Sequence, residues 1–106
     1  MALYVYITDR CKEDAQSLGF EATMAKAKAQ LLEAQRVVGF HDFPPPYIRK
    51  KSKGRRLLAS RHAVGEDTVI TFLRVVSRES SDYRDFLDDR DRYGVVKMKH
   101  LINPID

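Results

Sequence analysis

The fold is decided by one continuous stretch, YIRKKSKGRRLLASRHAVGEDTVITFLRVV, which spans residues 47–76. Three segments within it, residues 47–51, 56–63 and 69–76, combine β-branched, aromatic and leucine side chains in strand-like runs. Lys53-Gly54 separates the first two segments, and Gly65-Glu66-Asp67 separates the last two. Short breaks that contain glycine are typical of hairpin turns. The stretch therefore predicts three strands that form an antiparallel meander.

The residues before the meander predict one strand and two helices. Residues 3–8, Leu-Tyr-Val-Tyr-Ile-Thr, are typical of a strand in the middle of a sheet. Asp9 is expected to cap a helix that ends near Gly19. A second helix is expected from about residue 21 to residue 35, where alanine, leucine, lysine and glutamine prevail. On it, a stripe of small side chains is expected to pack against the sheet: Ala22, Ala25, Ala29 and Leu32.

Two further segments complete the predicted layout. Residues 39–46 contain a glycine and three consecutive prolines, so they predict a connecting loop. Residues 80–87 predict a short C-terminal helix capped by Ser80 or Ser81. Residues 1–92 then form one domain, and residues 93–106 form a C-terminal extension or linker. The predicted class is α+β, with a helical hairpin packed on a small, mainly antiparallel sheet.

Composition bounds the classes of function that are open to the chain. The 106 residues, 43% of them hydrophobic, provide one modest core and argue against a second domain. The single cysteine, Cys11, cannot form an internal disulfide, and no Cys/His cluster has metal-ligand spacing. No signal-like or membrane-length apolar run occurs. We therefore expect a soluble cytoplasmic protein that needs no metal or organic cofactor.

Charge is distributed unevenly along the chain, although the net charge is only +4. Residues 31–62 carry eight lysines and arginines against two acids, whereas residues 63–92 carry eight acids against five arginines. This polarity favours a cationic stripe that binds phosphates, beside an acidic segment that faces elsewhere. The alternative is a solvated edge strand whose charges prevent aggregation.

Several short motifs resemble the RelE/ParE toxin superfamily. Residues 53–57, Lys-Gly-Arg-Arg-Leu, are similar to the Gly-x-Arg-Leu strand opening of that family. Residues 72–78 followed by Tyr83 resemble its closing pattern, which is an apolar strand, a basic residue and then a tyrosine. The Asp9-Arg10 pair and the Leu-Gly before the second helix resemble its N-terminal half. The resemblance covers roughly residues 3–86 and implies a β-α-α-β-β-β fold.

For RelE-like members, the resemblance implies a ribosome-dependent nuclease in which the 2′-hydroxyl of mRNA attacks the adjacent phosphate. This reaction needs a base, cations around the charged phosphorane and an acid for the departing 5′-oxygen. Arg56 is expected to stabilise the transition state, Arg78 to clamp a phosphate, and Tyr83 to stack on a base or transfer a proton. Arg49 and Lys51 share one face of an alternating strand near the scissile phosphate. Lys51 suits the role of base better, because a guanidinium keeps its proton.

Other residues have a functional and a structural interpretation. His62 shares a face with Arg56, so it is either an acid–base group or a structural histidine. Arg74 interrupts an apolar strand and either contacts phosphate or satisfies a buried carboxylate. Tyr4 and Tyr6 share one face of their strand, and we expect them to pack in the core, with stacking on bases as the alternative. The basic side chains expected to contact nucleic acid are Lys50, Lys53, Arg55, Arg61, His62 and Arg74.

The resemblance leaves three functions open. The first is a toxin of a bacterial toxin–antitoxin system, whose partners are mRNA on the ribosome and an antitoxin protein. The second is a non-catalytic RelE-like module that binds nucleic acid or protein at the N-terminus of a longer protein, such as a superfamily I helicase. Residues 95–106 favour that interpretation, since they resemble a linker more than a natural terminus. The third is a ParE-like inhibitor of DNA gyrase.

Overall fold

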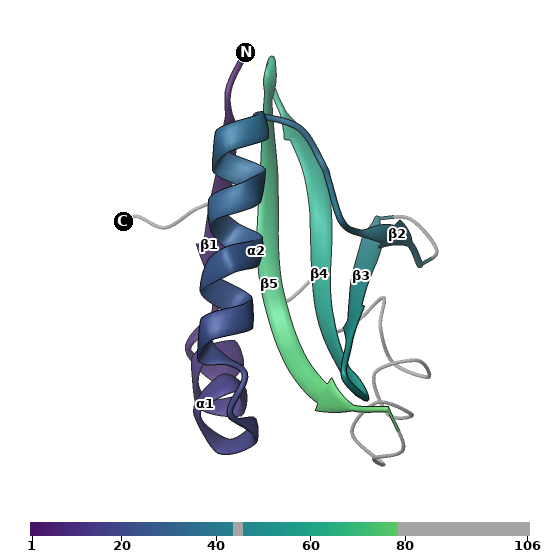
Figure 1. Ribbon diagram of the computed structural model, residues 1–106. Helices are drawn as coiled ribbons and strands as arrows, with labels where there is room; N and C mark the ends of the chain where they lie inside the picture. Colours follow the sequence, from purple (N-terminus) through teal and green to yellow (C-terminus); the bar gives the residue numbers. More distant parts are fainter. Residues whose placement is uncertain (44–45, 79–106) are drawn as a thin grey trace.

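The computed structural model describes residues 1–43 and 46–78 (Figure 1). The two helices cover one face of a five-stranded sheet with the strand order β1-β5-β4-β3-β2. β1 runs parallel to β5, and the other neighbouring pairs are antiparallel. This is the predicted α+β arrangement. In chain order, the elements are β1 (Leu3–Ile7), α1 (Asp9–Leu18), α2 (Glu21–Ala34), β2 (His41–Asp42), β3 (Tyr47–Ser52), β4 (Arg55–Val64) and β5 (Asp67–Ser77).

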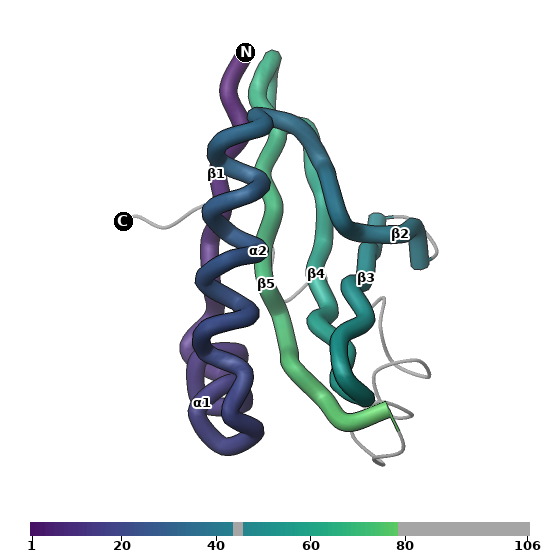
Figure 2. Tube along the Cα trace, viewed as in Figure 1, coloured from purple at the N-terminus to yellow at the C-terminus, as the bar shows by residue number. Residues whose placement is uncertain are grey.

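The meander forms from β3, β4 and β5 as predicted, and both of its turns contain glycine. Lys53 and Gly54 have φ values of 49° and 79°, the two positive angles that a tight hairpin turn between twisted strands requires. Gly65, with φ of 63°, lies in the turn that joins β4 to β5. A bulge between Leu58 and Ala59 interrupts the β4–β5 register, and Figure 2 shows β5 curving toward its C-terminal end.

β1 lies at an edge of the sheet, so the prediction of a central first strand is wrong. The parallel pairing places β5 in the interior instead, where its apolar run is buried. Leu3 on β1 belongs to the core between the sheet and the helices. Tyr4 and Tyr6 point the other way and are 47% and 42% exposed, which contradicts their expected place in the core. The helices cover the face of β1 that carries Leu3, so the side chains on the other face remain exposed (Figure 1).

The start of α1 differs by one residue from the prediction. Thr8 is the N-cap, and its hydroxyl oxygen accepts a hydrogen bond from the backbone N–H of Cys11 at 3.0 Å. Asp9, the expected cap, is the first residue of the helix and adds favourable charge there. The end of the helix is as predicted, with Gly19 in the left-handed conformation.

α2 buries a different face from the one that its alanine stripe predicted. Met24, Ala27 and Leu31 are buried, whereas the four residues of the predicted stripe are exposed. Methionine and leucine remove more apolar surface from water than alanine does, so packing selects the face that carries them. α1 packs against β5 and α2 against β1, which leaves the β3 side of the sheet less covered.

Two apolar clusters lie on opposite faces of the sheet. The larger, between the sheet and the helices, includes the fully buried Leu31, Leu57, Ile70 and Phe72. The smaller lies on the other face and consists of Tyr47, Leu58, Leu73 and Val76, with Phe43 packed against it. Strands β4 and β5 therefore contribute buried side chains to both faces.

Asp14 fastens α1 to β5 at the point where β1 ends. Its Oδ2 accepts hydrogen bonds from Arg74 Nε at 2.6 Å and from the backbone N–H of Val75 at 3.0 Å. Its Oδ1 lies 3.4 Å from Arg74 Nη2. The carboxylate thus neutralises a buried guanidinium and satisfies a backbone donor at the edge of β5 that β1 does not reach.

Cys11 is expected to be inert in the folded protein, as a buried packing residue should be. Burial raises the pKa of its thiol to about 12, with a further rise from the charge of Asp14 and an opposing effect of Arg74. Since the thiolate is the nucleophile, iodoacetamide at pH 8 should modify the single cysteine far more slowly in the native protein than in urea. Mass spectrometry measures both rates, and equal rates would contradict this account of the thiol.

The expected C-terminal helix, Tyr83 and the segment from residue 93 onward lie outside the described residues. Within the predicted loop 39–46, the structure forms one short element that the sequence did not indicate. His41 and Asp42 pair with Arg49 and Ile48 of β3 and make up β2.

Candidate nucleic-acid interface

The basic side chains of β3 divide between the two faces of the sheet. Ile48 belongs to the core on the helix side, so Lys50 points to that side as well. Arg49 and Lys51 point to the opposite face, here called the distal face. The antiparallel register places Arg56 of β4 directly opposite Lys51, and hence on the distal face too. The shared face of Arg49 and Lys51, predicted from alternation, is confirmed, and the β3–β4 register adds Arg56 to it.

Arg49 is held in place by an aromatic ring. Its guanidinium carbon lies 4.5 Å from the centroid of the Phe43 ring, and the side chain is half-buried. A cation over an aromatic face at this distance is attracted by the ring. Phe43 itself packs on the distal apolar cluster. Arg49 is therefore a positioned cation.

Arg56 is a half-buried cation with hydrogen-bonding capacity to spare. Its Nη1 donates to the carbonyl of Arg55 at 3.0 Å. Its Nε is shielded from solvent and makes no hydrogen bond within residues 1–43 and 46–78. An unsatisfied buried donor costs about 1–3 kcal/mol. An oxyanion that approached this guanidinium would remove part of that cost, so the environment of Arg56 favours an anionic ligand.

Arg78 lies at the same end of the sheet as Arg56. Its backbone N–H donates to the carbonyl of Gly54 in the β3–β4 turn at 2.9 Å, and its side chain is exposed. That turn also carries Lys53 and leads into Arg55. Tertiary contact thus unites cations that are separated along the chain. The group, called the basic end, consists of Lys51, Lys53, Arg55, Arg56 and Arg78.

Besides Lys50, which points to the helix side, three of the expected nucleic-acid contacts lie away from the basic end. Arg74 is buried against Asp14, which is the structural alternative that the sequence left open. Arg61 and His62 lie toward the far end of β4, about 20 Å from Arg56 at the ordinary rise of a strand. Arg61 pairs with the buried Ile70 and is exposed, whereas His62 is half-buried. The geometry does not bring these three side chains to the basic end.

His62 should make the fold sensitive to acid. Burial lowers the pKa of His62 from its ordinary value of 6.5, so the unfolded chain binds this proton more tightly than the folded chain does. The stability contributed by the neutral ring is complete above pH 6.5 and is lost as the pH falls below that value. The thermal unfolding midpoint should therefore fall on acidification from pH 7.5 to 5.5, and it should fall less in His62→Gln.

The matched control is His41→Gln, because His41 is exposed. That variant should keep the pH dependence of the wild type. The same fall in His62→Gln as in the wild type would assign the acid sensitivity to other groups.

One residue of the interface escaped sequence reasoning. His41 lies in the loop 39–46, where it has no partner at ligand spacing, and nothing local marks it as functional. The β2–β3 register places it opposite Arg49, so the two side chains share the distal face. Histidine is the most frequent general acid–base side chain in enzymes. The sequence signal is weak because β2 has two residues and precedes a run of prolines.

Within the described ranges, no group of three or more His, Cys, Asp or Glu side chains has an arrangement that could hold a metal ion. No helix in the same residues is long and apolar enough to cross a membrane.

Comparison with solved structures finds this fold in a toxin. The chain is similar to Escherichia coli toxin RelE, solved in the free state as a variant with two arginines replaced by alanine. The TM-score is 0.56 and the sequence identity 22%, over 85% of this chain and 98% of the RelE chain. No protein-family model matches the chain, and no curated protein matches it. The RelE-like fold that the motifs predicted is confirmed.

Proposed function

We propose that this chain, which has a RelE-like toxin fold, is an endoribonuclease that cuts mRNA on the ribosome. The observation that carries the proposal is the convergence of Arg49, Lys51 and Arg56 on the distal face, with Arg78 at the same end. Such a substrate implies a cytoplasmic protein. An acidic segment of an antitoxin is the partner expected to cover the same cations.

The proposed reaction needs charge stabilisation above all. The 2′-oxygen forms a bond to phosphorus and loses its proton to a base, while the bond from phosphorus to the 5′-oxygen breaks. The 5′-oxygen leaves with the bonding electrons and takes up a proton, so the products are a 2′,3′-cyclic phosphate and a 5′-hydroxyl. Arg56 supports the phosphorane, because its half-buried guanidinium, whose Nε has no hydrogen-bond partner among the described residues, interacts more strongly with developing charge than a solvated one.

Proton transfer falls to the residues beside the two arginines. Arginine is poorly suited to act as a general base, so we assign Arg49, held by Phe43, the role of a phosphate clamp. Lys51 adjoins Arg56, and His41 adjoins Arg49. Lysine and histidine are both residue types that serve as general acids or bases in enzymes. We assign the proton transfers to Lys51 and His41.

His41→Asn should slow RNA cleavage by about 10²-fold or more, the usual contribution of a general acid or base. Binding of uncut RNA should change little, because asparagine can still donate a hydrogen bond. Primer extension on mRNA in a purified translation system measures the cleavage. His62→Asn removes a histidine at the far end of β4 and should cut at the wild-type rate. Equal rates for both variants would remove His41 from the mechanism.

The proposal itself is tested with the wild-type chain. Its expression should arrest growth, and purified protein should cut ribosome-bound mRNA. RNA that is bound without being cut would overturn the nuclease proposal and favour a binding module of the same fold.

A further inference from the structure

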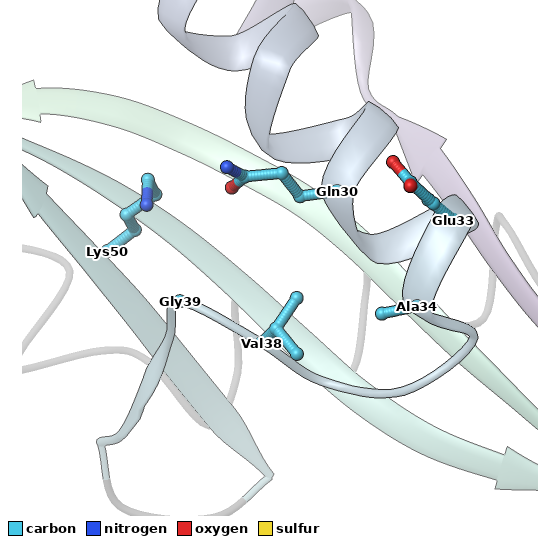
Figure 3. A pocket seen from close by; sticks show the side chains of 6 residues that line it. All are labelled: Gln30, Glu33, Ala34, Val38, Gly39 and Lys50. Carbon is cyan, nitrogen blue, oxygen red and sulfur yellow. The ribbon is translucent and has the colours of Figure 1, made fainter.

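A second concentration of positive charge lies on the helix side of the sheet. Between α2 and β3 there is a cleft of about 420 Å³. An adjoining hollow of about 660 Å³ shares Gln30 and Lys50 with it and extends past Gly39 to Glu33 (Figure 3). The cleft is lined by three lysines and two hydroxyl residues, which are Lys26, Lys50, Lys53, Thr23 and Ser52. A fourth lysine, Lys51, borders the cleft at the edge of β3, although its side chain points to the distal face.

The charges of the cleft have one sign. No carboxylate belongs to its lining, and the four lysines form no ion pair with any residue in the ranges 1–43 and 46–78. The adjoining hollow includes one acid, Glu33. Like charges that converge on one cavity repel one another, so an anion bound between them would be stabilised.

Lys50 is the lysine most constrained by the cleft. Figure 3 shows its side chain extending from β3 toward Gln30 of α2. Its Nζ lies 3.2 Å from the position that a Cβ on residue 39 would occupy, and residue 39 is a glycine with φ of 78°. The missing side chain at Gly39 therefore leaves room for the ammonium. An oxyanion placed beside it would also meet the amide of Gln30.

The cleft and the distal face meet at the edge of β3. β2 pairs with β3 at Ile48 and Arg49, so residues 50–52 have no outer strand within the described part of the chain. Lys51 borders the cleft and also lies opposite Arg56 of the distal face. A single strand that crosses this edge would meet cations on both sides. A cleft of a few hundred Å³ is the size of a small-molecule pocket, so it suits one backbone and not a duplex.

We propose that the cleft between α2 and β3 is a second phosphate-binding site, which holds single-stranded RNA outside the segment that is cut. The inference rests on the proposed function in taking RNA as the ligand. The strand runs from the cleft, past Lys51, to Arg56 on the distal face. Phosphate contacts of this kind position a nucleic acid without reading its bases. Cutting therefore depends on RNA that extends beyond the scissile phosphate.

The test uses a single-stranded RNA of about twelve nucleotides whose 2′-hydroxyls are all methylated, so that it can bind but cannot be cut. Lys50→Gln, Lys53→Gln and Lys26→Gln should each weaken binding about fivefold at 0.1 M salt and reduce the salt slope by about 0.7, the value for one phosphate contact on a single strand. Lys12→Gln on α1 removes an exposed lysine that lies away from the cleft, and it should leave the affinity and the salt slope unchanged.

A shorter RNA separates the two sites. An oligonucleotide of about three nucleotides can occupy the distal face without reaching the cleft, so Lys50→Gln and Lys26→Gln should bind it as the wild type does, whereas Arg56→Ala should weaken the binding of both lengths. Lys53 belongs to the basic end as well as to the cleft, so Lys53→Gln does not enter this comparison. Circular dichroism checks the fold. Should Lys50→Gln unfold, the exposed Lys26 carries the test.

The outcomes are distinct for the two proposals. If the cleft variants lose no more affinity for the twelve-nucleotide RNA than Lys12→Gln does, the second site is overturned, whether or not the protein is a nuclease. A different outcome would support the second site and overturn the nuclease proposal. In it, the wild type binds the RNA and the cleft variants bind it more weakly, but native mRNA on ribosomes is not cut.

Discussion

Asp14→Ala is expected to destabilise the folded protein by about 3–5 kcal/mol, the usual cost of removing one partner from a buried ion pair. The substitution leaves the guanidinium of Arg74 without its carboxylate in a place where that residue is 8% exposed. It also leaves the backbone N–H of Val75 without its acceptor. Urea denaturation followed by circular dichroism measures the loss, which is a large share of the 5–15 kcal/mol typical of a small domain.

Three control variants separate charge from packing. Arg10 is the exposed partner of Asp14, and its Nε lies 3.5 Å from Asp14 Oδ1. Arg10→Ala should therefore lower the free energy of unfolding by no more than about 0.5 kcal/mol. Arg74→Met should be costly alone, because it leaves the carboxylate buried. In the double variant Asp14→Leu/Arg74→Met the costs should be less than additive, since neither charge remains. If Asp14→Ala lowers the free energy of unfolding by less than about 1 kcal/mol, the contacts of Asp14 do not hold α1 to β5.

Arg56→Ala is expected to reduce the cleavage of ribosome-bound mRNA by about 10²–10³-fold, the usual effect of removing one donor that stabilises a charged transition state. Folding should be preserved, because the side chain is half-buried and makes one hydrogen bond, to its neighbour's carbonyl, within the described residues. Primer extension gives the cleavage rate, and relief of growth arrest gives an independent measure. Arg56→Lys keeps the charge but loses the planar fork, so it should recover only part of the rate.

The matched control is Arg61→Ala, on the same strand. It removes an equal charge from a residue that lies away from the basic end, and should cut at nearly the wild-type rate. Cleavage by Arg56→Ala at the wild-type rate would exclude this residue from the reaction. If both variants lose the same share of the cleavage rate, the loss reflects only the general attraction between a basic protein and RNA.

Part of the fold was determined by local sequence. The alternation and the glycine turns of residues 47–76 predict β3, β4 and β5, since turn geometry and side-chain period depend on neighbouring residues. The same holds for the end of α1 at Gly19 and for the shared face of Arg49 and Lys51. Local patterns also carried the resemblance to RelE.

Long-range contacts decided the rest of the candidate sites. Alternation cannot show that β1 pairs with β5 and lies at the edge, because the residue pattern of a strand does not determine which strand lies beside it in the sheet. The pairing of β2 brought His41 to Arg49, and the bond to Gly54 brought Arg78 to the basic end. Arg74 does not belong to the interface, because it forms an ion pair with Asp14. The alanine stripe of α2 was misleading because the buried face is chosen by the apolar area that packing can remove from water. The sequence by itself thus determined the strands, their turns and the cations that share a face, whereas the tertiary structure alone decided which distant residues join them, because that choice depends on contacts between segments far apart in the chain.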